Sequence, residues 1–295
     1  MPTALREKII SWAHSASLEI STFKNPADLA DVKSRRLFIP SSPAKDPVET
    51  TIAYAVQLKN DGFNPVPHIA VRNYKNRAHL EEALSILQQA NITRILLIAG
   101  DKQNPGAITN TLEILEDNLL VKYGMQHVCF AGHPNGHPHA SPQEADLALK
   151  TKNAFVQQTK QIEGSLITQL CFNAGQVLTW ANRINGNTMP IIAGIYGPLQ
   201  NPPHLIRAAR LCGYRWAEVL AIAPHIASAY VTGAVPTQLI LDYAQAPTGK
   251  IAGLHIFTFG NVAGTAKMLR ALEEGQFEIT RNILGKRRLA LLHAG

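Results

Sequence analysis

The sequence predicts a closed (β/α)8 barrel, a TIM barrel, with an extra helix at the N-terminus. The chain has 295 residues and is 46% hydrophobic, which is enough for a large core. It contains eight short apolar runs bounded by turn residues, and the segments between them repeat apolar residues at helical spacing. The runs are continuous instead of alternating, which is typical of parallel strands covered on both faces. We expect a single barrel domain over residues 1–295.

The strands are expected, in order, at residues 17–21, 36–41, 65–71, 94–100, 127–132, 165–172, 190–197 and 253–260. The first 17 residues mix charged side chains into a helical pattern, which predicts the extra helix. An open doubly wound sheet is the rival architecture. It usually shows a G-x-G-x-x-G turn after its first strand, and "SLEISTFKNP" has none.

The helix predicted over residues 46–62 has the clearest boundaries. Asp46 is its expected N-cap, Pro47 takes the first helical position and Gly62 follows its end. Similar apolar stripes predict helices around residues 80–87, 112–119, 177–184 and 262–269. The long segment between the last two strands should hold two or three helices, including residues 215–231 and 236–246.

Composition excludes several classes of protein. No apolar run is long enough for a membrane span, and the start of the chain does not resemble a signal peptide, so we expect a cytoplasmic protein without a membrane partner. The net charge of +7 is scattered except in the basic tail at residues 281–295, which favours an anionic small molecule over nucleic acid. Cys129, Cys171 and Cys212 lie far apart and are expected to be core thiols.

Polar residues at strand ends are the candidates for chemistry, because the carboxyl ends of barrel strands converge on the ligand site. These residues are Glu19, His68, Asp101 and Gln169. Burial in an apolar strand predicts a raised pKa for Glu19, which would keep it available as a proton donor. Structural alternatives stay open: an ion pair for Glu19, a helix or turn cap for Asp101, a backbone-satisfied amide for Gln169 and a core imidazole for His68.

The loop "GHPNGHPH" brings His133, His137 and His139 close together in the sequence. A metal-dependent barrel hydrolase using these histidines is an alternative function. The flanking prolines and the lack of a nearby acidic ligand match no strong metal signature, so we expect no metal.

Several motifs resemble the methylenetetrahydrofolate reductases, in particular their short, single-domain bacterial members. "LEIS" resembles the first-strand segment with the catalytic glutamate, "PHIAV" the Pro-His strand and "AGD" the Arg-Gly-Asp turn. "GHPNGHP" resembles the Tyr-Pro-x-x-His-Pro loop, "ITQLCF" the Ile-Thr-Gln-Phe-Phe-Phe strand and "HIFTFGN" the last strand. The similarity runs in order from about residue 17 to 275, which makes it more specific than any single motif.

This resemblance implies a flavoprotein in which FAD passes a hydride to or from the one-carbon bridge of folate, interconverting 5,10-methylene- and 5-methyltetrahydrofolate. It would act in one-carbon metabolism and methionine biosynthesis. By motif position, Glu19 would protonate the pterin-side nitrogen and open the methylene bridge. Asp101 would lie near the flavin and pterin, and Gln169 would hydrogen-bond the pterin ring.

The resemblance also implies a set of FAD-binding positions, with the lysine pairing with the cofactor's pyrophosphate. These positions are His68, Ala99, Gly100, Asp101, His133, His137, Asp146 and Lys152.

Three departures from the family pattern bear on the cofactor. Ala99 replaces an arginine and His133 replaces a tyrosine, which predicts weak flavin affinity or a different cofactor. The aromatic residue that stacks on nicotinamide and pterin is missing near Pro202, so NADH and NADPH are expected to be poor donors. The reaction could then run toward oxidation of methyltetrahydrofolate or use another electron partner. A barrel that binds folate or flavin without turnover is a further alternative, and assembly into a homo-oligomer is left open.

Overall fold

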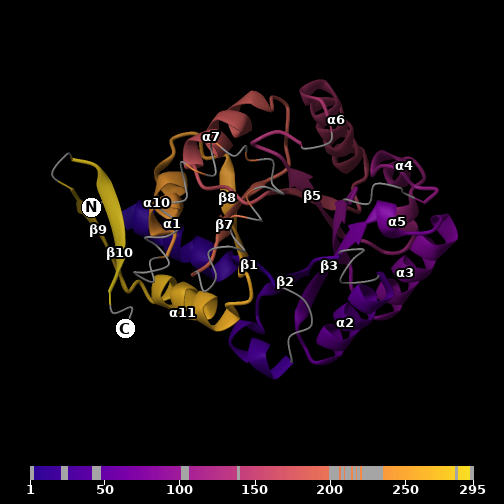
Figure 1. Cartoon of the computed structure of the whole chain (residues 1–295), viewed down its shortest axis with the longest axis horizontal. Coiled ribbons are helices and arrows are strands. Elements are labelled where there is room, and N and C mark those ends of the chain that lie inside the picture. Colours follow the sequence, from indigo (N-terminus) through magenta and orange to yellow (C-terminus); the bar gives the residue numbers. More distant parts are fainter. Residues whose placement is uncertain are drawn as a thin grey trace.

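The computed structural model describes residues 3–20, 26–41, 48–100, 106–137, 140–198, 206, 209, 214, 217, 220, 235–282 and 285–292. Eight parallel strands pair in chain order and close into a barrel, which confirms the predicted (β/α)8 fold (Figure 1). The strands are β1 (Ser17–Glu19), β2 (Arg36–Ile39), β3 (Asn64–Ala70), β4 (Arg94–Ile98), β5 (His127–Gly132), β6 (Glu163–Thr168), β7 (Ile191–Tyr196) and β8 (Ile251–Phe257).

Helices surround the barrel (Figure 1). They are α1 (Thr3–Ser15), α2 (Val48–Asn60), α3 (Arg77–Gln89), α4 (Leu112–Leu115), α5 (Leu119–Lys122), α6 (Pro142–Gln158), α7 (Ala174–Arg183), α10 (Thr237–Gln245) and α11 (Val262–Glu273). Two 3-10 helices, η1 (Pro26–Val32) and η2 (Val71–Asn73), lie in the connections. The extra helix predicted at the N-terminus is α1, which packs against α10 and α11. Among the described residues, no helix combines the length and apolar character that a membrane crossing requires.

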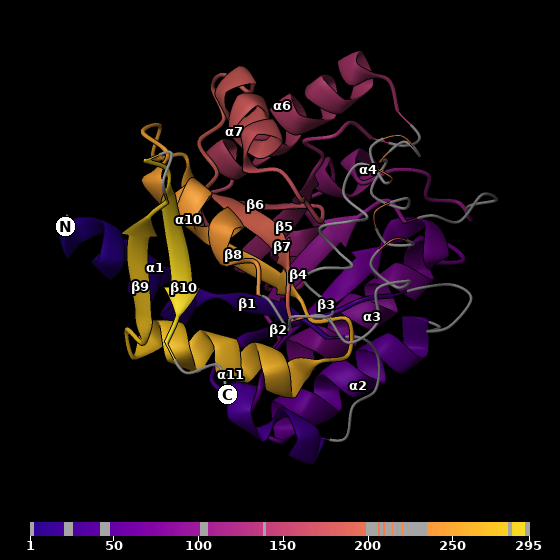
Figure 2. The same cartoon turned by 60° about the vertical axis from the view of Figure 1, so that its left-hand side comes forward.

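Local structure differs from the sequence expectation in two places. The helix expected around residues 112–119 is two short helices, because Asn118 adopts a left-handed backbone conformation with φ of 52°. An unpredicted antiparallel hairpin, β9 (Phe277–Arg281) and β10 (Arg287–Leu291), extends into the basic tail. This hairpin forms because Phe277, Ile279 and Leu289 are buried, with β10 against α10 (Figure 2). Asp46, Pro47 and most of residues 215–231 lie outside the described residues.

The core has two layers, because successive side chains of each strand point to opposite sides of the barrel wall. The larger layer lies between the wall and the helices. The smaller layer fills the barrel and is formed by Phe38, Val66, Leu96, Cys129 and Ile167. Cys129 and Cys171 are buried free thiols, as expected, and Cys212 lies outside the described residues.

The barrel closes between β1 and β8. Ser17 pairs with His255 and Glu19 pairs with Phe257 in this register. The backbone N–H and the hydroxyl of Thr258 both donate to the carbonyl oxygen of Glu19, at 3.1 and 2.8 Å. This closure fixes the backbone of Glu19 at the carboxyl end of its strand.

Candidate functional site

The carboxylate of Glu19 lies between two imidazoles inside the barrel. Its Oε2 atom is 3.6 Å from Nε2 of His68 on β3 and 3.8 Å from Nε2 of His255 on β8. Both Nε2 atoms are buried, and within the described part of the chain neither has a hydrogen-bond partner at normal distance. Two strands on opposite sides of β1 therefore direct a ring nitrogen at the same carboxylate oxygen.

The orientation of His255 is fixed by its surroundings. Its Nδ1 atom lies 2.9 Å from the hydroxyl of Ser17, and the side chain is fully buried. The rings of Phe38 and Phe257 pack edge-on against it, with centroids at 4.6 and 4.9 Å. When the Ser17 hydroxyl donates to Nδ1, the proton of the neutral imidazole is on Nε2, where it faces Glu19.

The electrostatics of Glu19 correct one expectation. Burial pushes the pKa of Glu19 upward, but the two imidazoles outweigh burial and hold that pKa below its ordinary value. The predicted raised pKa is therefore wrong, because two ring nitrogens stabilise the carboxylate. Burial lowers the pKa of His68 to about 4, so this histidine is neutral near pH 7. The resting site holds an ionised carboxylate and a neutral His68.

A second group of residues, the basic cluster, consists of His133 and His137 on the loop after β5 and Lys152 on α6. The two imidazole rings pack edge-on with centroids 4.5 Å apart. Burial, with smaller contributions from the neighbouring His137 and Lys152, lowers the pKa of His133 to about 3. Burial also lowers the pKa of Lys152 to about 8, and its ammonium lies 5.6 Å over the ring of Phe130. Such a group of basic side chains suits an anion.

Gly100 follows β4 and directly precedes Asp101, which lies outside the described residues. Its φ is +87°, and a Cβ atom there would lie 3.0 Å from the Cβ of Ala70 and 3.6 Å from Oδ1 of Asn73. Among the described residues, that Asn73 oxygen is buried without a hydrogen-bond partner. The backbone carbonyl of Ala99 accepts from the N–H of Arg72 at 3.0 Å. Glycine thus suits both the left-handed backbone and the close approach of Ala70 at this position.

The other predicted site residues are placed as follows. Gln169 comes directly after β6, and its N–H donates to the carbonyl of Gly132 at 3.0 Å. Asp146 on α6 is half exposed and lies 3.9 Å from Arg183 on α7. Its described ionic partner is therefore on a neighbouring helix and not in the basic cluster. Asp101, His139 and Pro202 lie outside the described residues.

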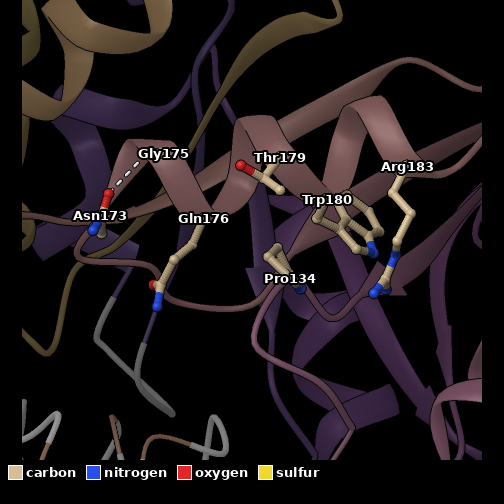
Figure 3. A pocket seen from close by; sticks show the side chains of 7 residues that line it. All are labelled: Pro134, Asn173, Gly175, Gln176, Thr179, Trp180 and Arg183. Atoms are coloured by element: carbon tan, nitrogen blue, oxygen red, sulfur yellow. Dashed lines mark hydrogen bonds between the residues drawn. The ribbon is translucent and has the colours of Figure 1, made fainter.

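A cavity of about 420 Å³ lies between the loop after β5 and α7 (Figure 3). Its lining residues are Pro134, Asn173, Gly175, Gln176, Thr179, Trp180 and Arg183. The side chain of Asn173 accepts from the N–H of Gly175 and caps the helix (Figure 3). Through Pro134 the cavity adjoins the basic cluster, but Glu19 and its two histidines do not line it.

The three-histidine metal site of the alternative function is not seen in the described part of the chain. Within those residues, no three or more His, Cys, Asp or Glu side chains are grouped so that they could hold a metal ion. His133 and His137 are adjacent, and the position of His139 is not described.

Fold and site together define a (β/α)8-barrel protein that gathers a partly exposed Glu19 with two buried histidines, and a basic cluster, on the side of the barrel where the strands end. The family model for methylenetetrahydrofolate reductase matches residues 41–272, and the chain belongs to this family. The match confirms the resemblance read from the motifs. It begins after β1, so Glu19 itself lies before the matched segment.

Solved structures resemble the chain at low sequence identity. One is an uncharacterized protein from Clostridium thermocellum that binds two copies of 5-methyl-5,6,7,8-tetrahydrofolic acid. It is 12% identical, with 91% of this chain and 99% of that chain covered and a TM-score of 0.54. Another is a putative lyase/mutase from Burkholderia cenocepacia, 11% identical, with 92% and 88% covered and a TM-score of 0.45.

Two residues of the Glu19 site were not predicted. Ser17 and His255 belong to strands that were expected, but neither was singled out as a candidate. A lone imidazole in the apolar run "GLHIFTFG" was the available signal for His255, of the same kind as His68 in "PVPHIAV". Ser17 gave no signal, because a serine at a strand start is common.

Proposed function

We propose that this chain is a flavin-dependent oxidoreductase that interconverts 5,10-methylene- and 5-methyltetrahydrofolate. The observation that carries the proposal is the carboxylate of Glu19 held between His68 and His255, in a member of the methylenetetrahydrofolate reductase family. A protein of the same fold binds 5-methyltetrahydrofolic acid, which supports a folate as the ligand.

The role of Glu19 follows from the proton balance of the reaction. Converting the 5-methyl group into the methylene bridge removes a hydride from the methyl carbon and a proton from the nitrogen that closes the bridge. This nitrogen is the one remote from the pterin, because the pterin-side nitrogen keeps the carbon throughout; the expected proton transfer to the pterin-side nitrogen does not balance. An ionised Glu19 accepts this proton, and in reverse the protonated carboxyl donates it and opens the bridge. His68 and His255 stabilise the carboxylate. Because this carboxylate is ionised at rest, the ligand-free protein suits oxidation of 5-methyltetrahydrofolate.

The residues present fit a flavin dinucleotide in two respects. Lys152 and His137 offer cationic and hydrogen-bonding groups for its pyrophosphate. Gly100 lies close to Oδ1 of Asn73, a buried acceptor without a partner among the described residues and of the kind that a ring N–H requires. FAD, when bound, supplies the two-electron acceptor and donor for the hydride. Ala99 and His133, in place of arginine and tyrosine, are expected to weaken its binding.

Titration of the apo-protein with FAD, followed by flavin fluorescence, tests the cofactor. Addition of 5-methyltetrahydrofolate to the FAD-loaded protein without oxygen then tests the reaction, because hydride transfer bleaches the flavin absorbance. Loss of absorbance supports the proposal. If FAD does not bind at high micromolar concentration, the proposal of a flavin cofactor is wrong. If the folate binds but the flavin is not bleached, the protein is a non-catalytic barrel.

A further inference from the structure

A polar layer closes the N-terminal mouth of the barrel, at the opposite end from Glu19. Five strands each place a polar residue two positions before a residue of the apolar layer, so that both point into the barrel. The pairs are Arg36 before Phe38, the exposed Asn64 before Val66, Arg94 before Leu96, His127 before Cys129 and Ser165 before Ile167.

One side of this layer is a chain of hydrogen bonds. Nε2 of His127 lies 2.9 Å from the hydroxyl of Ser165, which lies 3.3 Å from the sulfur of Cys129. Nδ1 of His127 lies 3.2 Å from Oε2 of the exposed Glu163. Burial and the charge of Arg94 together outweigh the contact with Glu163 and lower the pKa of His127 to about 4. The carboxylate of Glu163 is therefore paired with a neutral imidazole and not with an arginine.

The other side of the layer holds two arginines without a counter-charge. Within the described residues, neither Arg36 nor Arg94 forms an ion pair, and Arg36 donates to the carbonyl of Ser15 at 2.6 Å. Burial lowers the pKa of Arg36, and the charge of Arg94 lowers it further, so the two guanidinium groups repel each other. Burial raises the pKa of the Cys129 thiol, which therefore stays neutral and supplies no negative charge.

We propose that the N-terminal mouth of the barrel binds a small oxyanion, a phosphate or a carboxylate, between Arg36 and Arg94. Guanidinium groups bind the oxygens of such anions through two parallel N–H bonds, and one anion would offset the repulsion of both. This site is independent of the proposed folate reaction, because its residues face the other end of the barrel from Glu19.

Thermal unfolding of wild type, R94Q and K152M tests the site. The Tm of each protein is measured in inorganic phosphate and in potassium chloride of equal ionic strength. Lys152 belongs to the basic cluster, so K152M separates phosphate bound there from phosphate bound at the mouth. At a concentration tenfold above Kd, phosphate bound at the mouth should raise the Tm of K152M by about 3 °C, and that of wild type by at least as much. R94Q should lose this shift. In phosphate-free buffer its Tm should exceed that of wild type, since the repulsion is gone.

Parallel titrations with acetate and malonate distinguish a carboxylate from phosphate as the bound anion. R94K keeps the charge but loses the guanidinium fork, so the increase in its Tm caused by phosphate should be at most half that of wild type. R94K also replaces R94Q as the test variant if R94Q does not fold. Equal phosphate shifts in R94Q and wild type, or no shift of wild type with any of the three anions, would overturn the proposal. So would a shift that K152M abolishes and R94Q retains.

Discussion

Nδ1 of His255 lies 2.9 Å from the hydroxyl of Ser17, and the two residues pair in register across the closure of the barrel. This contact leaves Nε2 of His255 facing Glu19. In S17A the imidazole loses its partner and is held less firmly, so we expect folate turnover to fall about tenfold. The pKa that Glu19 contributes to the pH profile should rise, because the carboxylate is less stabilised.

The S17T variant restores a hydroxyl and should recover most of the wild-type rate and pH profile. Measuring kcat against pH for all three proteins checks the role of Ser17 as a positioning residue. An S17A protein that is slower with an unchanged pH profile would show that the hydroxyl contributes only to stability.

Replacement of Glu19 by glutamine preserves the size of the side chain but removes its ability to exchange a proton. We expect folate turnover to fall by at least about 10²-fold, the usual effect of losing a general acid or base, while FAD binding stays near wild type. Steady-state kinetics measure the loss of folate turnover, and FAD titration measures whether FAD binding is unchanged. E278Q, on the exposed face of β9, is the control. Full turnover in E19Q would remove Glu19 from the mechanism.

The buried neutral His68 predicts that acid destabilises the protein. Its pKa is lowered from the ordinary value of 6.5 to about 4, so the unfolded chain binds a proton that the folded protein does not. Stability from this group is therefore complete above about pH 6.5 and falls as the pH drops toward 4. Between pH 7 and 5 the loss is about 2 kcal/mol.

Urea unfolding of wild type and H68Q at pH 7 and 5 measures this effect. The decrease in unfolding free energy should be smaller in H68Q by about 2 kcal/mol. His14 is well exposed, so H14Q should behave as wild type. An equal decrease in H68Q and wild type would mean that His68 is not the responsible group.

Lys152 should make FAD binding depend on pH. Burial lowers its pKa to about 8, so the ammonium loses its proton as the pH rises through 8, and affinity for the pyrophosphate should fall above that value. K152M should bind FAD about tenfold more weakly at pH 7 and lose this dependence. K150M, an exposed lysine on the same helix, is the matched control. Fluorescence titrations at pH 7 and 9 decide the result.

Nicotinamide cofactors should reduce the bound flavin slowly, because no aromatic residue stands near Pro202 to stack on the nicotinamide. Anaerobic stopped-flow comparison of NADH, NADPH and 5-methyltetrahydrofolate measures the three rates directly. We expect the folate to be the fastest reductant. Rapid reduction by NADH would show that another residue supplies the stacking surface.

Apolar patterning predicted the barrel because each strand is short, local and buried on both faces. β5 was predicted with both of its ends, at residues 127–132. β6 was expected to continue to residue 172 but ends at Thr168. Leu170 and Cys171 are buried outside the strand, so the apolar run in the sequence is longer than the strand itself. The C-terminal hairpin was missed because its three buried residues are separated by charged ones, which read as a solvated tail.

The candidate site was predicted only in part, for the same kind of reason. A charged residue inside an apolar strand is visible in the sequence, so Glu19 and His68 could be chosen. Ser17 and His255 could not be predicted as parts of the site, because no local sequence pattern links two residues that are 238 positions apart.

The sequence by itself determined the fold class, the order of the strands and the family, since these depend on local periodicity and on motifs that occur in order along the chain. Only the tertiary structure decided the charge state of Glu19. Burial alone would have raised its pKa, but the register of β1 with β8 and the closure of the barrel bring two ring nitrogens within 4 Å of one carboxylate oxygen. Electrostatic stabilisation depends on distances between strands, and these distances exist only once the barrel has closed.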